Sequence, residues 1–203
     1  TASYQIEGAW NENGKSLSIW DEFTHRGGKI EDHSTGDIAC DHYHRYKEDV
    51  KLMAELGLKA YRFSIAWTRI LPEGSGKVNE KGLEFYSKLV DELLKYNITP
   101  YVTLYHWDLP YCLHLKGGWK NPESPLWFEE YTKAVVKCFG DRVKHYITFN
   151  EPSVFMGCGY SQGVHAPGIK LGDKDLLYMG HNIHLAHGKA VRAIRSVVSK
   201  AKI

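Results

Sequence analysis

Apolar residues recur at helical spacing along several segments of the chain. In residues 41–57 they follow one another at steps of three and four, which predicts an amphipathic helix that stops at Gly57. Residues 79–96 repeat the pattern, and Asn79 is the expected N-cap of this second helix. Both segments are long enough to pack one face against a sheet.

Two more helices are predicted in the second half of the chain. One opens at Ser124-Pro125, a cap followed by a proline in the first turn, and closes at Gly140. The other runs from about Asp173 to near the C-terminus. The remaining long stretches, at 11–40, 106–123 and 152–172, show no periodicity and are predicted to be loops.

Short runs rich in β-branched and aromatic residues lie between the helices, at 60–65, 98–105 and 143–149. Strands that alternate with helices, without hairpin signals, indicate βαβ units and a parallel sheet. Two architectures fit this order, a doubly wound sheet and a (β/α)8 barrel. A doubly wound nucleotide binder should carry a glycine-rich turn after a strand, and the glycines at 74–76 and 117–118 match no such motif.

Polar residues stand where the predicted strands end, namely Ser64, His106 and the pair Asn150-Glu151. Chemistry at successive carboxyl ends of strands is typical of the α/β (β/α)8 TIM barrel. A complete barrel needs eight strands and typically about 250 residues. We therefore expect residues 1–203 to be a single partial domain, holding about the first four βα units of such a barrel.

Composition and charge narrow the choice of partners. The chain is 43% hydrophobic and 25% charged, with a net charge of +2, which is ordinary for a globular protein. No basic patch suggests nucleic acid or an anionic membrane, and no apolar run could span a bilayer. The four cysteines form no C-x-x-C pair, so reduced thiols and a cytoplasmic location are expected. A chain that begins without Met leaves room for a signal peptide.

Three histidines, His181, His184 and His187, recur at steps of three on the last predicted helix and raise the question of a metal stripe. The helix has no H-E-x-x-H motif and no acidic residue on that face. A solvated or core-edge face is the better interpretation, and neither a metal nor a cofactor is expected.

The pair Asn150-Glu151 is the strongest candidate for chemistry. A lone acidic residue at a strand end is more often solvated or salt-bridged than catalytic. Here the adjacent amide could bind a substrate hydroxyl while the carboxyl moves a proton. His106-Trp107, from the preceding strand, would add an imidazole and a stacking ring to the same rim. That set suits a sugar.

Six segments together resemble glycoside hydrolase family 1, the β-glucosidase and β-galactosidase family of retaining enzymes on a (β/α)8 barrel. The resemblance falls in the family's order and spans nearly the whole chain. The matching segments are Thr1-Ala-Ser-Tyr-Gln-Ile-Glu-Gly8, Ser18-Ile-Trp-Asp-Glu-Phe23, Tyr61-Arg-Phe-Ser-Ile-Ala-Trp67, Thr103-Leu-Tyr-His-Trp-Asp-Leu-Pro110, Gly117-Gly-Trp119 and Thr148-Phe-Asn-Glu-Pro152.

The resemblance implies a small-molecule β-glycoside or oligosaccharide as the substrate. Glu151 would be the acid/base, and Asn150 would bind the 2-hydroxyl of the sugar being cleaved. A retaining glycosidase needs two carboxyl groups about 5–5.5 Å apart, one protonated and one ionised. Contacts to the 2-hydroxyl strengthen in the transition state.

The resemblance also assigns residues to the rest of the site. Gln5 and His106 would bind the 3- and 4-hydroxyl side of the sugar, and Trp107 would support its pocket. Arg62 would sit near the nucleophile and hold it ionised. Further candidates for the site wall, with packing as the alternative, are Arg69, Trp119 and Tyr160.

The chain departs from the family pattern in three places. The nucleophile of the family lies in an Ile-Thr-Glu-Asn-Gly segment on a later strand, and nothing here matches it. The first strand of the family should precede Thr1. Ser153 stands where many members carry an aromatic residue that faces the leaving group, which leaves the aglycone open. The chain is therefore expected to be the N-terminal half of a member, clipped at both ends and inactive alone.

Several alternatives stay open. The chain could be an inactive half barrel or a sugar-binding relic. Within the family, β-galactosidase and 6-phospho-β-glucosidase compete with β-glucosidase. Phospho-glycosidases usually differ from this chain at 106–109 and at Pro152, which favours an unphosphorylated sugar.

Overall fold

The structure is a computed structural model that describes all residues, 1–203. Its sheet has three parallel strands in the order β1-β2-β3. They span β1 (Ala60–Ser64), β2 (Thr99–Tyr105) and β3 (His145–Phe149). The predicted parallel sheet is thus confirmed, and each strand joins the sheet on the same side as the one before. That sequential order is the one a (β/α)8 barrel requires.

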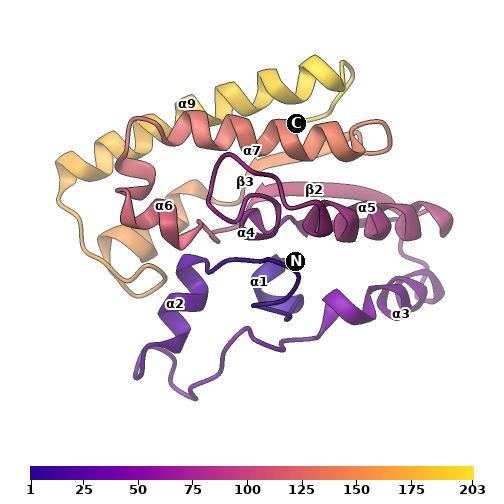
Figure 1. Cartoon of the computed structure of the whole chain (residues 1–203), viewed down its shortest axis with the longest axis horizontal. Helices are drawn as coiled ribbons and strands as arrows, with labels where there is room; N and C mark the ends of the chain where they lie inside the picture. The colour runs from indigo at the N-terminus through magenta and orange to yellow at the C-terminus, as the bar shows by residue number, and fades with distance from the viewer.

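Three long helices connect and cover the strands. They are α5 (Glu80–Lys95) between β1 and β2, α7 (Ser124–Phe139) between β2 and β3, and α9 (Asp173–Val197) after β3. Figure 1 shows α7 and α9 side by side above the sheet. The chain then returns to the sheet, where Lys202 forms a parallel bridge with His145. A fourth segment therefore begins beside β3.

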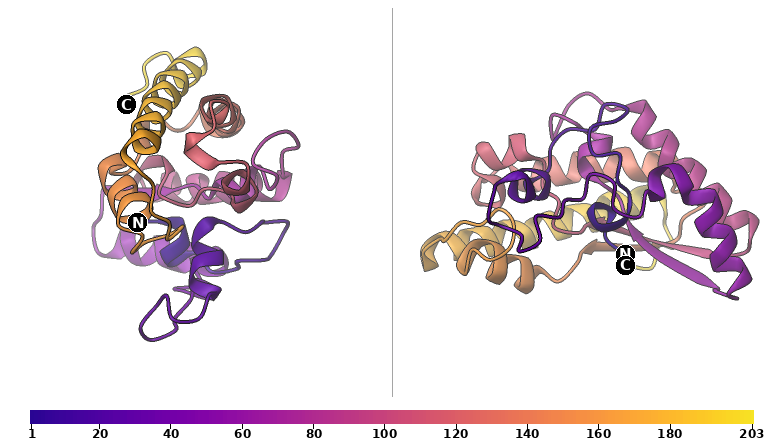
Figure 2. Two further views of the ribbon diagram at one scale, coloured as in Figure 1. Left: turned by 90° about the vertical axis from the view of Figure 1, so that its left-hand side faces the viewer. Right: turned by 90° about the horizontal axis from the view of Figure 1, so that it is seen from below.

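The N-terminal part lies on the other side of the sheet from α7 and α9, as Figures 1 and 2 show. It contains α1 (Ser3–Ile6), α2 (Ile19–His25) and the predicted amphipathic helix, α3 (His42–Glu55). Gly57, the expected stop after α3, has φ +79°. None of the helices combines the length and the apolar character of a membrane span.

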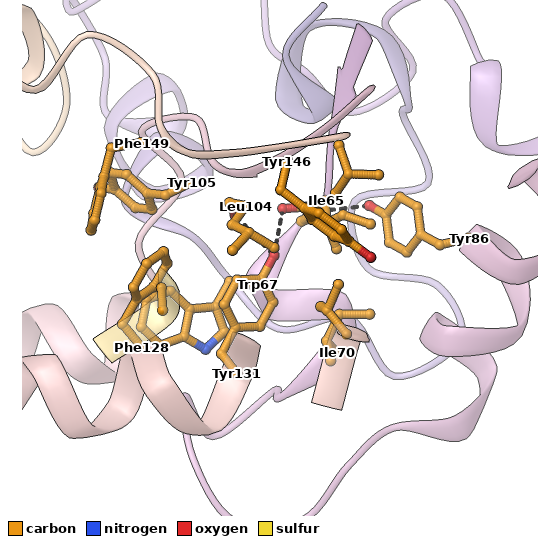
Figure 3. Packing of buried hydrophobic residues seen from close by; sticks show 14 of the residues in the cluster. Ile65, Trp67, Ile70, Tyr86, Leu104, Tyr105, Phe128, Tyr131, Tyr146 and Phe149 are labelled. Carbon is orange, nitrogen blue, oxygen red and sulfur yellow. Dashed lines mark hydrogen bonds between the residues drawn. The ribbon is translucent and has the colours of Figure 1, made fainter. Parts of the chain in front are cut away.

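The core fixes the carboxyl ends of the first two strands (Figure 3). The ring of Trp67 stacks on Tyr131, with centroids 4.8 Å apart. The buried Tyr131 hydroxyl lies 3.1 Å from the carbonyl oxygen of Ile65 and 2.9 Å from that of Leu104. Because these carbonyls follow β1 and lie near the end of β2, one side chain of α7 holds both strand ends at a fixed separation.

One of the two expected caps is confirmed in position, and the other is wrong by one residue. Asn79 occupies the N-cap position of α5, but its amide donates to the carbonyl oxygens of Asn13 and Arg69 instead of capping the helix. In α7, Glu123 takes the N-cap position and Ser124 is the first helical residue. In α5 the side chain of the cap residue bonds outside the helix, and in α7 the helix begins one residue earlier than the sequence suggests.

The predicted loops contain short helices that the sequence pattern does not reveal. Segments of three to seven residues cannot repeat a helical period, so no periodicity marks them. The short helices not yet named are α4 (Trp67–Ile70), α6 (Tyr111–Leu115), the 3₁₀ turn η1 (Gly118–Lys120), α8 (Pro152–Val154) and the π-helical η2 (Phe155–Ser161).

Candidate active site

Two residues at the carboxyl ends of the strands have unusual backbone angles. Trp107 has φ +77° and Glu151 has φ +44°, both in the left-handed region that residues other than glycine rarely adopt. Each such residue costs about 1–3 kcal/mol, and such residues cluster at functional sites. The two outliers follow neighbouring strands, β2 and β3, so they mark one edge of the sheet.

Asn150 connects all three strand ends. It is 8% exposed, and the guanidinium of Arg62, on β1, donates to its side-chain oxygen. Because arginine can only donate, this bond fixes the orientation of the amide. The amide nitrogen therefore points to His106 Nε2, at 3.1 Å, and to Glu151 Oε2, at 3.3 Å.

His106 is neutral in this arrangement. Burial, assisted by the positive charges of Arg62 and the N-terminal amine, lowers the pKa of the imidazole to about 4. Nε2 accepts the bond from Asn150, so the ring proton is on Nδ1. The site thus holds an uncharged imidazole beside the amide at neutral pH.

Trp107 supports the same region through its indole. Nε1 donates to the backbone carbonyl oxygen of Asn150 at 2.8 Å. This bond joins the end of β2 to the residue that precedes Glu151. The side chain of Glu151 itself is exposed, and its one hydrogen bond is to the amide of Asn150. A solvent-facing carboxyl on a braced backbone is free to contact a ligand.

A cavity of about 370 Å³ opens beside these residues. It is lined by Gln5, His106 and Trp107, three of the residues expected to bind a sugar. Gln5 lies on α1 and is exposed. Aromatic rings form much of the remaining wall, and sugar C–H faces stack on such rings. These rings belong to Tyr4, Trp20 and His165.

The backbone around Gln5 is held by bonds to the strand ends. The amide nitrogen of Ser3 donates to Ser64 Oγ at 2.7 Å, at the end of β1. The buried carboxylate of Glu7 accepts from Arg69 Nε at 2.8 Å and from the Tyr86 hydroxyl at 2.6 Å. α1 is therefore fixed on both sides of Gln5.

The structure thus brings five of the six candidate residues into one hydrogen-bonded group, and the sixth, Gln5, lines the same cavity as two of them. The members of the group are Arg62, His106, Trp107, Asn150 and Glu151.

The other candidates for the site wall lie in the interior. Trp119 is fully buried among aromatic rings, and Arg69 is buried in its ion pair with Glu7. Tyr160 is buried as well, and burial raises the pKa of its hydroxyl. Sequence reasoning missed His165 as a wall residue, because it comes from an aperiodic loop and follows no strand.

Two of the three histidines of α9 are engaged, each with a different partner. His187 Nδ1 lies 2.8 Å from Thr148 Oγ1, and His184 Nδ1 lies 2.7 Å from the carbonyl oxygen of Gly180. No group of three histidine, cysteine or acidic side chains is arranged to hold a metal ion. The four cysteines are all free.

The fold and the rim together are those of part of a (β/α)8-barrel enzyme. Residues 1–203 match the model of glycosyl hydrolase family 1, and the chain belongs to that family of O-glycosyl hydrolases. The chain spans about half the length of the relatives it matches.

Three relatives illustrate the match. "Beta-glucosidase A" of Acetivibrio thermocellus is 54% identical over all of this chain and 45% of its own length. "Aryl-phospho-beta-D-glucosidase BglC" of Bacillus subtilis is 49% identical over all of this chain and 43% of its own. The solved structure of the Thermotoga maritima β-glucosidase in complex with glucoimidazole has a TM-score of 0.97 and 52% identity, covering all of this chain and 46% of that one.

Proposed function

We propose that this chain supplies the acid/base half of the active site of a retaining β-glycosidase, with a β-glucoside as the substrate. The observation that carries the proposal is the position of Asn150 between Arg62, His106 and Glu151. An amide, a neutral imidazole and an exposed carboxyl are then gathered in one hydrogen-bonded group, and the imidazole lines the cavity. Such groups suit a ligand with several neighbouring hydroxyls.

Glu151 is the proton donor in this proposal. Its carboxyl protonates the oxygen of the departing aglycone while a second carboxylate attacks the sugar. In the next step Glu151 takes a proton from the water that hydrolyses the glycosyl-enzyme. Its solvent exposure supports this role, because a ligand can reach a carboxyl whose one hydrogen bond is to the amide of Asn150.

Asn150 and the cavity residues hold the sugar. The amide nitrogen of Asn150 is the proposed donor to the 2-hydroxyl, which takes the place of its 3.3 Å bond to Glu151, and Arg62 fixes the orientation of the amide. Gln5 and His106 provide hydrogen bonds to the 3- and 4-hydroxyls. Trp107 and the neighbouring rings provide the apolar wall. A volume of about 370 Å³ leaves room for a single sugar ring.

The attacking carboxylate is proposed to come from outside these 203 residues. The other acidic residues near the rim are buried and already held. Glu7 is bound to Arg69 and Tyr86, and Asp108 accepts from the hydroxyl of Ser3. Neither carboxylate can reach a sugar without giving up these bonds.

The test is a chimera in which the parts of the Thermotoga maritima β-glucosidase outside the match flank residues 1–203. We call this protein the completed chimera. It should hydrolyse p-nitrophenyl β-D-glucoside, and Glu151→Gln should lower kcat by about 10²–10⁴-fold, the usual contribution of a general acid/base. The matched control is Glu123→Gln, whose kcat should not change. The 203-residue chain alone should show no turnover.

Parallel assays with the β-galactoside and the 6-phospho-β-glucoside decide the sugar. Faster turnover of either would replace the glucoside in the proposal and keep the mechanism. A chimera that binds the sugar without any turnover would favour a sugar-binding half barrel instead.

A further inference from the structure

A second, much smaller cavity lies under the N-terminal segment, next to the proposed sugar pocket, with which it shares Tyr4 and Gly36. Its volume is about 10 Å³, and its wall includes Asp21, Thr68 and Asp108. All three residues are at most 2% exposed. They come from α2, from α4 and from the loop after β2, so the cavity lies where three separate segments meet.

Each of the three residues has one buried oxygen without a protein partner. These atoms are Asp21 Oδ1, Thr68 Oγ1 and Asp108 Oδ1. A buried polar atom without a hydrogen bond costs about 1–3 kcal/mol, and native proteins contain few of them. Three such atoms around one cavity indicate a missing common partner.

The donors that reach the two carboxylates all bond to the other carboxylate oxygens, Oδ2. The ammonium of Lys15 bonds to Asp21 Oδ2 and to the carbonyl oxygens of Trp10 and Ser16, which uses all three of its protons. The hydroxyl of Ser18 also donates to Asp21 Oδ2. A solvent molecule is therefore the simplest common partner for the three remaining oxygens.

The hydroxyl of Ser3 likewise bonds to the other oxygen of the carboxylate that it contacts, because it donates to Asp108 Oδ2 at 2.9 Å. Ser3 also stands two positions before Gln5. Any group that holds Asp108 in place therefore helps to hold α1 against the end of β2.

We propose that this cavity is a built site for one buried water molecule. A water can donate one hydrogen bond to Asp21 Oδ1 and one to Asp108 Oδ1, and it can accept one from Thr68 Oγ1. Three hydrogen bonds are the usual number for a buried water, and about 10–15 Å³ is the least volume that holds one. With this water, each of the three oxygens has a hydrogen-bond partner, and no side chain has to move.

The water connects the N-terminal segment to the rim of the sheet. Asp108 directly follows Trp107 and bonds to Ser3, so the water is linked to both of these residues. Asp21 lies in the first turn of α2, where it and Ser18 form a capping box, so the water is linked to the start of α2 as well. The site is independent of the proposed glycosidase activity, since it needs only the fold.

A high-resolution crystal structure of the purified protein tests the proposal directly. We expect one density peak within 3.2 Å of all three oxygens. An empty cavity would overturn the proposal. So would a peak with six or more oxygen ligands at about 2.3–2.6 Å, which would mark a calcium-like cation.

A pair of variants gives a second, independent measurement. Thr68→Val keeps the shape of the side chain and removes the bond to the water, so the unfolding equilibrium constant should rise about fivefold. The control is Tyr160→Phe, which removes a buried hydroxyl that also lacks a partner but does not line this cavity. The control should not weaken the fold. If Thr68→Val behaved like the control, the hydroxyl would have no partner and the proposal would be wrong.

Discussion

The guanidinium of Arg62 donates a hydrogen bond to the side-chain oxygen of Asn150, 88 positions further along the chain. Arg62 Nε also donates to Thr103 Oγ1 at 2.9 Å, so the same guanidinium spans β1, β2 and the end of β3. The orientation of the Asn150 amide, and through it the contacts to His106 and Glu151, depends on this one side chain.

Arg62→Lys should therefore impair catalysis, although the substitution keeps the positive charge. An ammonium group cannot donate in two fixed directions as the guanidinium does. Hydrogen bonds to charged groups contribute about 1.5–3 kcal/mol, so kcat/KM of the completed chimera should fall about 10–100-fold. Arg142→Lys is the control, because Arg142 pairs with Asp91 and Asp141 on the surface. Equal kinetics for the two variants would exclude the proposed role of Arg62.

His106 and Asp108 should affect the pH dependence of stability in opposite directions. The folded-state pKa of His106 is about 4, below its ordinary 6.5. Between pH 4 and 6.5 the unfolded chain binds more protons at this residue than the folded chain does. The free energy of unfolding therefore falls as the pH falls toward 4. Burial raises the pKa of Asp108 from 3.8 to about 6, so the folded chain binds more protons there and stability is lost as the pH rises.

Urea unfolding between pH 4 and 6.5 measures both effects. His106→Gln should flatten the rise of stability with pH, and Asp108→Asn should steepen it. Slopes that change in the same direction for both variants would show that one of the two assignments is wrong.

The ion pair between Arg69 and Glu7 should be essential for the fold. Both side chains are at most 5% exposed, and the pair holds the segment that carries Gln5. Arg69→Met would leave the Glu7 carboxylate buried without its cation, which costs about 3–5 kcal/mol. Lys88→Met is the control, because its pair with Glu84 is exposed to solvent and should contribute little to stability. Chemical denaturation measures the free energy of unfolding of both variants. A loss below about 1 kcal/mol for Arg69→Met would refute the essential role of the ion pair.

Two glycines inside helices should respond in opposite ways to alanine. A Cβ at Gly82 in α5 would lie 2.0 Å from the carbonyl oxygen of Arg69, so Gly82→Ala should destabilise the protein despite the better helix propensity of alanine. Gly188 in α9 has nothing within 4 Å of its Cβ position. Gly188→Ala should therefore stabilise the protein by about 0.5–1 kcal/mol, as seen in thermal unfolding. A stabilising Gly82→Ala would contradict the close packing of α4 on α5.

The long helices could be predicted from the sequence because each repeats its period several times, and the strands because they are rich in β-branched and aromatic residues. The strands β1, β2 and β3 and the helices α3, α5, α7 and α9 all lie within a few residues of their expected bounds. The side-chain caps could not be predicted, because the bond that Asn79 prefers is to Asn13, which is distant in sequence. Short helices carry no period at all.

The candidate site was predictable for a related reason. The carboxyl ends of parallel strands meet at one edge, so His106 and Asn150 had to approach each other once the strands were placed. The wall contributed by His165 and the contact between Ser3 and Asp108, 105 positions apart, depend on loops whose path no local pattern determines.

The most direct test of the central claim is azide rescue of Glu151→Ala in the completed chimera. Azide needs no general base, so it can attack the glycosyl-enzyme in place of the water that Glu151 activates. With an activated aryl β-glucoside, we expect azide to restore turnover and the product to be β-glucosyl azide. Wild-type turnover by Glu151→Ala, no response to azide, or an α-configured azide product would contradict the role of Glu151 as the acid/base of a retaining glycosidase.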